Sequence, residues 1–393
     1  MPGSVIIAGA RTPIGKLAGA LASLSATDLG AVAIASALER AGLEPGQVDY
    51  VYMGQVLQAG QGQLTARQAA VKAGIPLSTP AVTINKVCLS GLNAIYLADQ
   101  MIAAGEADIV VAGGMESMTR APYLLQDARG GYRYGDGVLV DSMLADALTC
   151  ALDAKSMGLA TDQYNEGVSS RSRQDAFAAA SHEKAANAVK NGNLAEEITA
   201  VTIPQRRGDP IVVDSDEGIR PGTTVESLSR LRPAFSDSGS ITAGNASQIS
   251  DGAAAVVVAS RQAAQKLGLM PLGEFVSYGQ VAGPTPSLLQ QPADAINAAL
   301  ANGKLTLDDL DVIEINEAFA AVALASVDAL GLSEDRVNVN GGGIALGHPV
   351  GMSGTRLALT VLHELRRRGG GYAVASLCGG GGQGDALVVR SLS

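Results

Sequence analysis

The chain has 393 residues, 47% of them hydrophobic and 17% charged, which is long enough for two or three units that share cores. Its net charge of −10 argues against nucleic acid and anionic membranes as partners, although local Arg and Lys groups can still hold an anionic ligand. No apolar run reaches about 18 residues, so we expect no membrane span. The N-terminal residues carry no basic targeting pattern, and the three cysteines form neither a disulfide framework nor a metal-binding spacing. We therefore expect a cytoplasmic protein with free thiols and no metal.

The first part of the chain has the pattern of an α/β unit. Strand, strand, helix and strand patterns follow one another at residues 48–53, 81–88, 90–104 and 109–112. The second part repeats this order with nearly the same spacing, at residues 310–316, 336–340, 353–368 and 372–377. Ordered agreement of four elements predicts a duplicated α/β unit with a largely parallel, covered sheet in each half.

Residues 119–244 do not fit this repeat. They contain one clear amphipathic helix pattern, at 172–190, and many loop signals. After them, the apolar pattern at 251–259 predicts a strand that returns to the first half. We interpret the insertion as a lid or ligand-binding subdomain, with a merely decorative insertion as the alternative.

Cys88 and Cys378 occupy similar positions, each at the end of a strand pattern. Cys88 precedes a helix pattern, where free backbone N–H groups and the helix dipole lower a thiol pKa from about 8.5 toward neutrality. The glycines at 379–382 offer closely spaced N–H donors, as an oxyanion hole requires, although such turns also hold phosphate. The alternative for Cys88 is a buried apolar thiol. We interpret Cys150, in an apolar helix pattern, as part of the core.

His348 lies in a loop framed by Gly and Pro before a helix pattern, which is a useful position for a general base. His182 and His363 lie within helix patterns and look structural, and His363 is near a helix C-terminus, which favours partial positive charge. Asn316 follows a strand pattern, and two interpretations of it stay open. It either orients a water or donates to an oxyanion, with support from Glu317, or it caps a helix.

Four segments resemble the signature blocks of the thiolase family, in the family's order and spacing. They are residues 85–91, 316–320, 347–354 and 378–381. The resemblance covers essentially the whole chain and implies a thiolase fold, in which two duplicated βαβαβαββ halves form a layered α/β/α/β/α core with an inserted loop domain. The implied boundaries are 1–118 with 250–271 for the N-terminal half, 119–249 for the CoA-binding loop domain and 272–393 for the C-terminal half.

The resemblance also implies roles for the candidate catalytic residues. Cys88 is similar to the nucleophile that accepts the acyl group, and Cys378 to the acid/base thiol that deprotonates the second acyl-CoA. His348 matches the residue that activates the nucleophile and, with a water held by Asn316, forms one oxyanion hole. The backbone N–H groups of Cys88 and Gly380 match the other. Since a thioester is electrophilic and its α-protons are acidic, two thiols of near-neutral pKa suffice without a metal, and ping-pong kinetics are expected.

Further residues match positions where thiolases contact coenzyme A or the acyl group. Those in the insertion that match CoA contacts are Arg220, Ser227, Phe235, Ala243 and Ser247. Ala318 and Phe319 match contacts to the pantetheine arm. Short-chain members of the family commonly have a His-Met-Gly sequence in the loop domain, and its Met fits a short acyl pocket. This chain keeps Met157, but Ser156 replaces the His.

This resemblance implies an acyltransferase that reversibly condenses two acetyl-CoA to acetoacetyl-CoA and CoA, with CoA thioesters as substrates and no prosthetic group. One alternative is a degradative 3-ketoacyl-CoA thiolase with longer substrates. Another is an acyl-CoA-binding protein of the same fold that does not condense, but the intact Cys88, Asn316, His348 and Cys378 count against it. A ketosynthase-like enzyme would carry a second histidine in place of Cys378. We expect a homo-oligomer, either a dimer or the tetramer common among thiolases.

Overall fold

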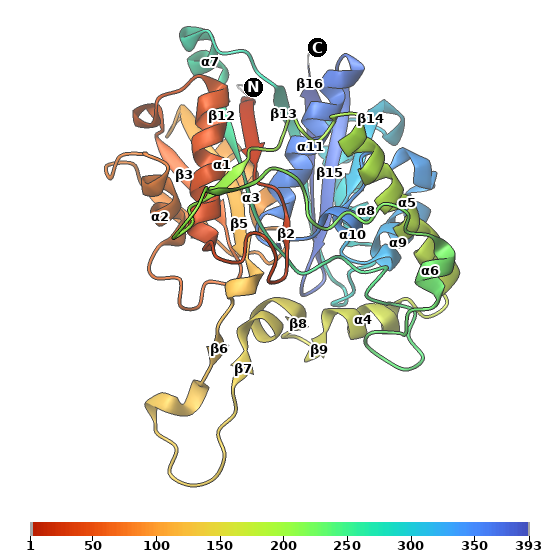
Figure 1. The fold of residues 1–393 in the computed structure, drawn as a ribbon. Helices are drawn as coiled ribbons and strands as arrows, with labels where there is room; N and C mark the ends of the chain where they lie inside the picture. Colours follow the sequence, from red (N-terminus) through yellow and green to blue (C-terminus); the bar gives the residue numbers. More distant parts are fainter. Residues whose placement is uncertain (1–2, 392–393) are drawn as a thin grey trace.

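The computed structural model describes residues 3–391, in which two α/β halves lie side by side (Figure 1). The elements of the N-terminal half are β1 (Ser4–Arg11), β2 (Gly15–Lys16), α1 (Ala26–Ala41), β3 (Tyr50–Gly54), α2 (Thr65–Lys72), β4 (Ala81–Ile84), α3 (Ser90–Ala103), β5 (Ile109–Ser117), β12 (Ser250–Ser260) and α7 (Arg261–Leu267). Those of the C-terminal half are β13 (Gly273–Ala282), α8 (Gln291–Gly303), β14 (Leu310–Ile315), α9 (Ala320–Leu330), α10 (Gly343–Leu346), α11 (Ser353–Arg368), β15 (Gly371–Gly379) and β16 (Gln383–Ser391).

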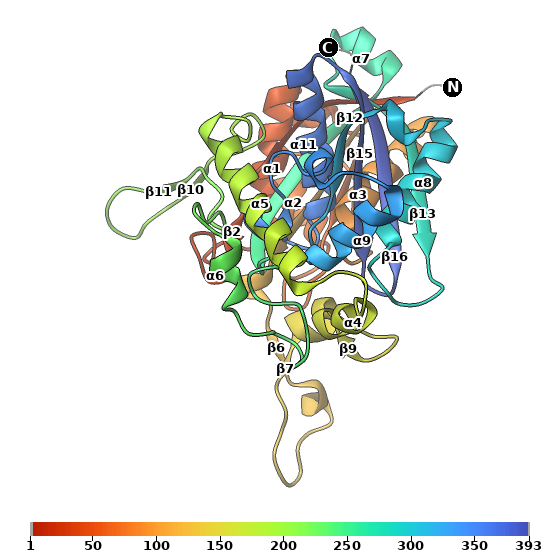
Figure 2. The same ribbon diagram turned by 90° about the vertical axis from the view of Figure 1, so that its right-hand side faces the viewer.

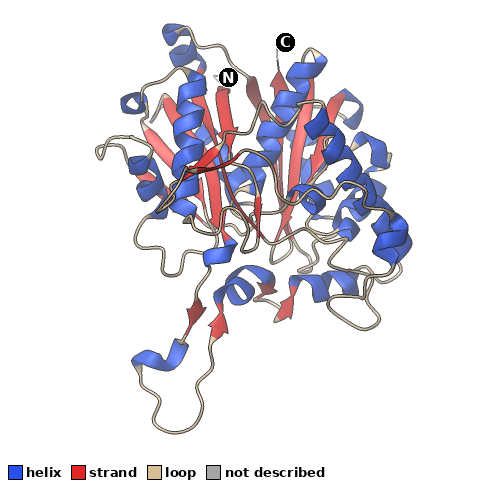
Figure 3. Ribbon diagram, in the orientation of Figure 1, coloured by secondary structure: helices blue, strands red, loops and turns tan. Residues whose placement is uncertain are grey.

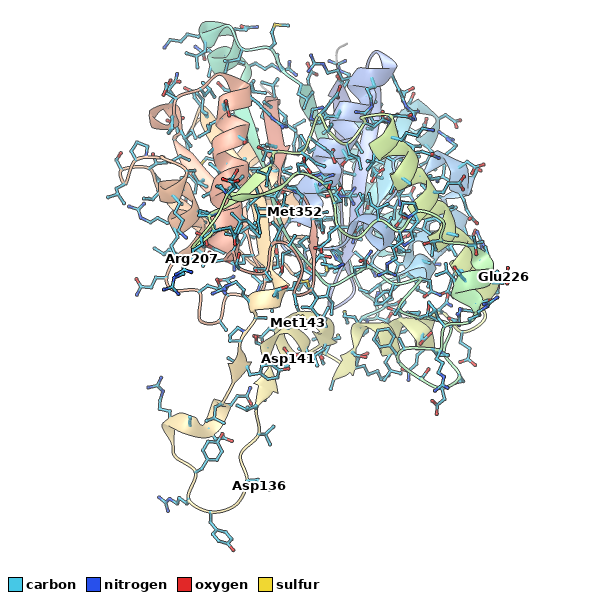
Figure 4. All side chains as sticks on the ribbon, viewed as in Figure 1. Asp136, Asp141, Met143, Arg207, Glu226 and Met352 are labelled. Carbon is cyan, nitrogen blue, oxygen red and sulfur yellow. The ribbon has the colours of Figure 1, made fainter. Side chains whose placement is uncertain are left out.

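The insertion between β5 and β12 consists of short elements and one long helix. These are β6 (Tyr123–Leu124), β7 (Val140–Asp141), β8 (Thr149–Cys150), β9 (Lys155–Ser156), α4 (Met157–Tyr164), α5 (Arg171–Lys190), β10 (Val201–Ile203), β11 (Ile211–Val213) and α6 (Val225–Ser229). The segment between β6 and β7 projects away from the body, and Figure 4 places Asp136 at its far tip (Figures 2 and 4). β12 then pairs with β1 and β5, so the predicted return of the chain to the first half is confirmed.

The halves form five layers, as the resemblance implied, with strands grouped between helices (Figure 3). Alternation along the strands explains the layering, since Val111 packs toward α1 and α2 whereas its neighbours Val110 and Ala112 pack toward α3 and α11. In the other half, Val374 of β15 packs with α8 and α9 on the outer face, whereas Ala375 faces the central helices. The two halves of the sheet, which the β1–β13 pair joins, therefore lie on either side of one shared helical layer.

The prediction of largely parallel sheets is wrong. The strands follow the order β14-β15-β16-β13-β1-β12-β5-β3-β4 in one ten-stranded sheet, with β2 paired to β12. Within that path only the β14–β15, β3–β4 and β3–β5 pairs are parallel. Strands that follow one another without a helix between them, such as β15 and β16, pair antiparallel. The predicted strand-helix-strand pattern did not include these strands.

Two predicted strands end early, and a side chain is the reason in each case. The pattern at 81–88 ends at Ile84, because Asn85 Oδ1 accepts the Val87 N–H at 3.0 Å and turns the chain. The pattern at 336–340 forms a single bridge from Val337 to Ile313. Asn338 then pairs through its side chain with both backbone groups of Ile315, each at 2.8 Å, in place of a strand.

Other predicted elements are confirmed, and one extends further than expected. The helices predicted at 353–368 and 172–190 correspond to α11 and α5. The strand predicted to end before Gly113 continues as β5 to Ser117. Gly114 is needed there because a Cβ at this position would lie 1.9 Å from the Gly351 carbonyl oxygen. Strand β5 thus directly contacts the loop that leads into α11.

Cys150 is buried, as predicted, but it does not lie on a helix. A π-helical turn covers Met143–Leu148, and Cys150 belongs to the short strand β8, which pairs with β9. Within residues 3–391, no helix combines the length and the apolar character needed to cross a membrane.

Candidate active site

Cys88 lies in the turn between β4 and α3. Its neighbour Val87 has a φ of 51°, and Ser90 Oγ fixes the turn by donating to the Val87 carbonyl at 2.6 Å and accepting the Lys86 N–H at 2.8 Å. Burial raises the pKa of the Cys88 thiol to about 12, and the Glu116 carboxylate contributes to this. The backbone N–H groups of Cys88 and Gly380 face the sulfur and oppose the rise. The predicted shift of this pKa toward neutrality is therefore wrong, because desolvation outweighs the helix terminus.

Cys378 lies on β15, and its thiol is close enough to Cys88 for the two to influence each other electrostatically. The residue is 1% exposed, and burial and the nearby Cys88 both raise the pKa of its thiol. The resting thiol is therefore uncharged. The prediction of a near-neutral pKa fails here for the same reason. Both thiols are thus protonated at rest, so a proton has to move whenever either sulfur reacts.

His348 is buried in the loop between α10 and α11, and its ring is oriented by a serine. Its Nδ1 lies 2.5 Å from Ser353 Oγ, and that hydroxyl donates to the Pro349 carbonyl at 2.9 Å. The Ser353 oxygen therefore accepts the Nδ1 proton, which leaves Nε2 as an acceptor. Burial, with the Arg356 charge, lowers the pKa of His348 to about 4, so the ring is neutral and its Nε2 can take a proton.

Asn316 follows β14 and points at His348. Its Nδ2 is 3.4 Å from His348 Nε2, while its buried Oδ1 has no hydrogen-bond partner among the described residues. It is not a helix cap, because the cap of α9 is Phe319. Glu317 instead accepts hydrogen bonds from Ser181 Oγ, Asn338 Nδ2 and the Ile344 N–H at 2.6–3.0 Å, and so secures the segments around Asn316.

A cavity of about 520 Å³ opens between the insertion and the two halves and reaches His348. Several residues predicted to bind substrate line it, namely Met157, Arg220, Phe235, Ala243, Ser247 and Phe319. Ser227 does not line it, and its hydroxyl instead takes part with Thr224 in capping α6. Ala318 does not line it either, but its carbonyl accepts the Ser247 N–H at 3.0 Å and so holds one wall.

Two features of α4 shape the cavity. Ser156, which replaces the expected His, caps α4 by accepting the Leu159 N–H at 3.3 Å and also lines the cavity. Gly158 packs under the Phe235 ring, where a Cβ would meet ring atoms at 2.2 Å. Phe235 in turn lies edge-to-face with Phe319, at 6.1 Å between centroids.

Met157 separates this cavity from a second one of about 580 Å³. It is the one residue that lines both, and the second cavity is otherwise formed by residues 145–147 and 149–152 with Val56, Gln58, Ala59, Asn85, Val87, Gly380 and Gly381. A Cβ placed on Gly380 would lie 3.7 Å from the Met157 sulfur. Since the Gly380 N–H faces the Cys88 sulfur, Met157 closes the site next to the nucleophile.

Three residues with a clear relation to the site have no predicted role. In the sequence, Ser353 is one residue of the block 347–354 that resembles a thiolase signature. Its effect on the His348 tautomer depends on the folded structure. Arg356 lies on the same helix, buried beside Glu314. Glu116 lies on β5 and had no sequence signal beyond its position after two glycines. Among the residues described, no group of three or more His, Cys, Asp and Glu is arranged to hold a metal ion.

Comparison with known proteins places the chain in a family. A model described as "Thiolase, N-terminal domain" matches residues 4–262, and one described as "Thiolase, C-terminal domain" matches residues 269–391. The chain is 58% identical over 392 residues to a "Probable acetyl-CoA acetyltransferase" of Mycobacterium tuberculosis, with 100% of both chains covered. It is 51% identical over 388 residues to an "Acetyl-CoA acetyltransferase" of Cupriavidus necator, with 98% of each covered. The chain therefore belongs to the thiolase family.

Proposed function

We propose that the chain is an acetyl-CoA C-acetyltransferase that reversibly converts two acetyl-CoA to acetoacetyl-CoA and CoA. The observation that carries this proposal is that the partly buried thiol of Cys88 lies near the buried thiol of Cys378, while the neutral His348 lines the adjacent cavity formed with the insertion. The printed names of the full-length relatives support it. The substrates are CoA thioesters, and no prosthetic group is part of the proposal.

In the first half-reaction, Cys88 Sγ attacks the acetyl carbonyl carbon while His348 Nε2 takes the thiol proton. The oxyanion receives hydrogen bonds from the N–H groups of Cys88 and Gly380, which already face the sulfur. The C–S bond to CoA then breaks, and Cys378 gives its proton to the departing CoA sulfur. The products are acetyl-Cys88, free CoA, a Cys378 thiolate and a protonated His348.

In the second half-reaction, the Cys378 thiolate removes an α-proton from the second acetyl-CoA. The enolate oxygen is held by His348 Nε2–H and by a water on Asn316, whose Oδ1 is free to accept a hydrogen bond. The carbanion attacks the acetyl carbonyl, acetoacetyl-CoA forms, and the departing Cys88 sulfur recovers the proton from His348. Because both thiols begin and end protonated, the cycle balances and agrees with their raised pKa values.

The finer features of the assignment belong to the same proposal. Arg220, Phe235, Ala243, Ser247 and Phe319 hold CoA in the cavity that they line, with Ser227 and Ala318 nearby on the same segments. The loop domain, 119–249, is the CoA-binding part, and 1–118 with 250–271 and 272–393 are the two halves. We further propose a cytoplasmic homo-oligomer, a dimer or tetramer. The unpaired edge of β4 and the exposed Tyr123, Tyr134, Val138 and Leu139 of the projecting segment support this part.

A thiolysis and condensation assay tests the proposed function. With CoA, the protein should cleave acetoacetyl-CoA to acetyl-CoA, and with acetyl-CoA alone it should release CoA and form acetoacetyl-CoA. The same assay with 3-oxoacyl-CoAs of increasing length separates this activity from a degradative thiolase. Cleavage of long substrates without cleavage of acetoacetyl-CoA would refute the assignment and favour the degradative alternative.

A further inference from the structure

Glu116 is a buried carboxylate that the proposed reaction does not use. It lies near the end of β5, is 0% exposed and forms no ion pair with any residue in the range 3–391. A buried carboxylate without a cation is costly, so its hydrogen-bond partners indicate what it is for.

All its hydrogen bonds come from backbone N–H groups of two loops. Glu116 Oε2 accepts from Val56 at 2.9 Å and from Gly351 at 3.0 Å, and Oε1 accepts from Leu57 at 3.1 Å. Val56 and Leu57 follow β3 in the N-terminal half, whereas Gly351 belongs to the His348 loop of the C-terminal half. A single carboxylate therefore joins the two halves.

The segments that Glu116 holds are the ones that pack against the nucleophile. Val56, Leu57 and Val350 form one buried apolar cluster, and Cys88 packs at its edge. The contact with the His348 loop is tight, because a Cβ at Gly351 would lie 2.8 Å from Glu116 Oε2. The position of Cys88 relative to the His348 loop thus depends on this carboxylate.

We propose that Glu116 is a positioning residue for the nucleophile, which aligns the Cys88 turn with the His348 loop. This inference rests on the proposed function only in taking Cys88 as the nucleophile. Burial raises the pKa of Glu116 to about 7, and above that pH its negative charge adds to the effect of burial in raising the pKa of the Cys88 thiol. Of the other titratable groups, Asp251 faces Glu116 from β12 and Cys378 faces Cys88 from β15.

Three variants separate charge from alignment. Glu116→Gln removes the charge and keeps the length, Glu116→Asp keeps the charge but is one methylene shorter, and Asp251→Asn removes a neighbouring buried carboxylate as the matched control. The rate of Cys88 alkylation by iodoacetamide is measured by peptide mass spectrometry at fixed pH values between about 8 and 10, because only the thiolate reacts. These pH values lie below the raised pKa of the Cys88 thiol, so the rates of two variants at one pH report the difference between their thiol pKa values. Turnover is measured as acetoacetyl-CoA thiolysis, with kcat and KM determined separately.

For Glu116→Gln we expect Cys88 to be alkylated about tenfold faster at about pH 9, where Glu116 of the wild type is ionised, which corresponds to a fall of about 1 unit in the thiol pKa. Turnover should nevertheless fall by about tenfold in kcat, with a smaller change in KM, because alignment is lost. Glu116→Asp should keep the wild-type alkylation rate and lose kcat, and Asp251→Asn should change the alkylation rate less than Glu116→Gln.

An unchanged alkylation rate in Glu116→Gln, or an equal change in Asp251→Asn, would contradict a direct effect of Glu116 on the nucleophile and leave a merely structural residue. Wild-type kcat in Glu116→Asp would overturn the alignment effect, and this variant tests the proposal if Glu116→Gln does not fold. Alkylation uses no acyl-CoA. A changed alkylation rate in Glu116→Gln, when the wild type does not cleave acetoacetyl-CoA, would therefore refute the proposed function but support this inference.

Discussion

The loops before α3 and before α11 are equivalent in the duplicated halves, yet they carry different chemistry. Each leads into a Ser-Gly pair whose serine hydroxyl donates to a carbonyl of the preceding turn, Ser90 to Val87 and Ser353 to Pro349. In the first half this serine shapes the turn that holds Cys88. In the second half it contacts His348 Nδ1 and orients the ring. The same serine-fixed turn thus occurs twice, and the two copies hold Cys88, the proposed nucleophile, and His348, the proposed base.

The glycines of the two pairs bring these turns together. A Cβ at Gly91 would lie 2.8 Å from the Gly351 carbonyl oxygen, and one at Gly354 would lie 2.4 Å from the Leu92 nitrogen. Helices α3 and α11 therefore approach within backbone contact where they begin, and Met352, labelled in Figure 4, is buried beside this contact. The active site forms where the two copies of the turn meet.

The largest effect is expected when the base or its oxyanion partner is removed. His348→Ala and Asn316→Ala should each lower kcat by about 10²–10³, because the first removes a donor to a developing oxyanion and the second removes the group that holds the water donor. Circular dichroism should show that the fold is retained. His363→Gln, on α11 but outside the cavity lining, is the matched control and should keep near-normal turnover. Near-normal kcat in either active-site variant would remove that residue from the mechanism.

A smaller effect is expected at the two serines, and it tests their different tasks. Ser353→Ala should reduce kcat about tenfold, since the His348 tautomer is no longer fixed by this hydrogen bond. Ser90→Ala should instead slow the acylation of Cys88, while the dependence of kcat on pH on the acid side stays as in the wild type. Pre-steady-state acylation with acetyl-CoA and a pH profile of kcat distinguish them. Identical behaviour of the two variants would contradict the assigned division of roles.

The sequence predicted the long periodic elements and several of the residues that line the cavity, but not the protonation state of the two cysteines. Helix α11 was predictable because its apolar spacing is regular and a glycine follows it. The strand expected at 336–340 was not, because only the fold reveals that the Asn338 side chain pairs with Ile315. The thiol pKa of Cys88 was predicted from a local feature, the helix terminus, whereas burial by distant segments decides it.

Chain-length selection should respond at Met157, the residue between the two cavities. Wild-type protein should cleave acetoacetyl-CoA at least as efficiently, by kcat/KM, as 3-oxohexanoyl-CoA, because Met157 excludes the longer chain. Met157→Ala should improve the longer substrate severalfold relative to acetoacetyl-CoA, since each added methylene that fits contributes about 0.8 kcal/mol. If the wild type already prefers the six-carbon substrate, the acetyltransferase assignment fails.

The buried neutral His348 also predicts a pH dependence of stability. Its pKa is about 4 in the folded protein, against about 6.5 when unfolded, so the unfolded chain binds more protons between these values. This contribution to the free energy of unfolding is therefore complete above about pH 6.5 and is lost as the pH falls toward 4. In urea unfolding at several pH values, the free energy of unfolding should fall less at acid pH in His348→Gln than in the wild type. Equal losses would contradict a neutral, buried ring.

The division of labour between the two copies is tested most directly by the intact mass of the protein after incubation with acetyl-CoA. Wild type and Cys378→Ala should each gain one acetyl group, and Cys378→Ala should retain it because the second acetyl-CoA is not deprotonated. Cys88→Ala should gain none. A stable acetyl adduct on Cys88→Ala, or rapid condensation by Cys378→Ala, would contradict the assignment of the nucleophile to the first half and of the proton-transferring thiol to the second.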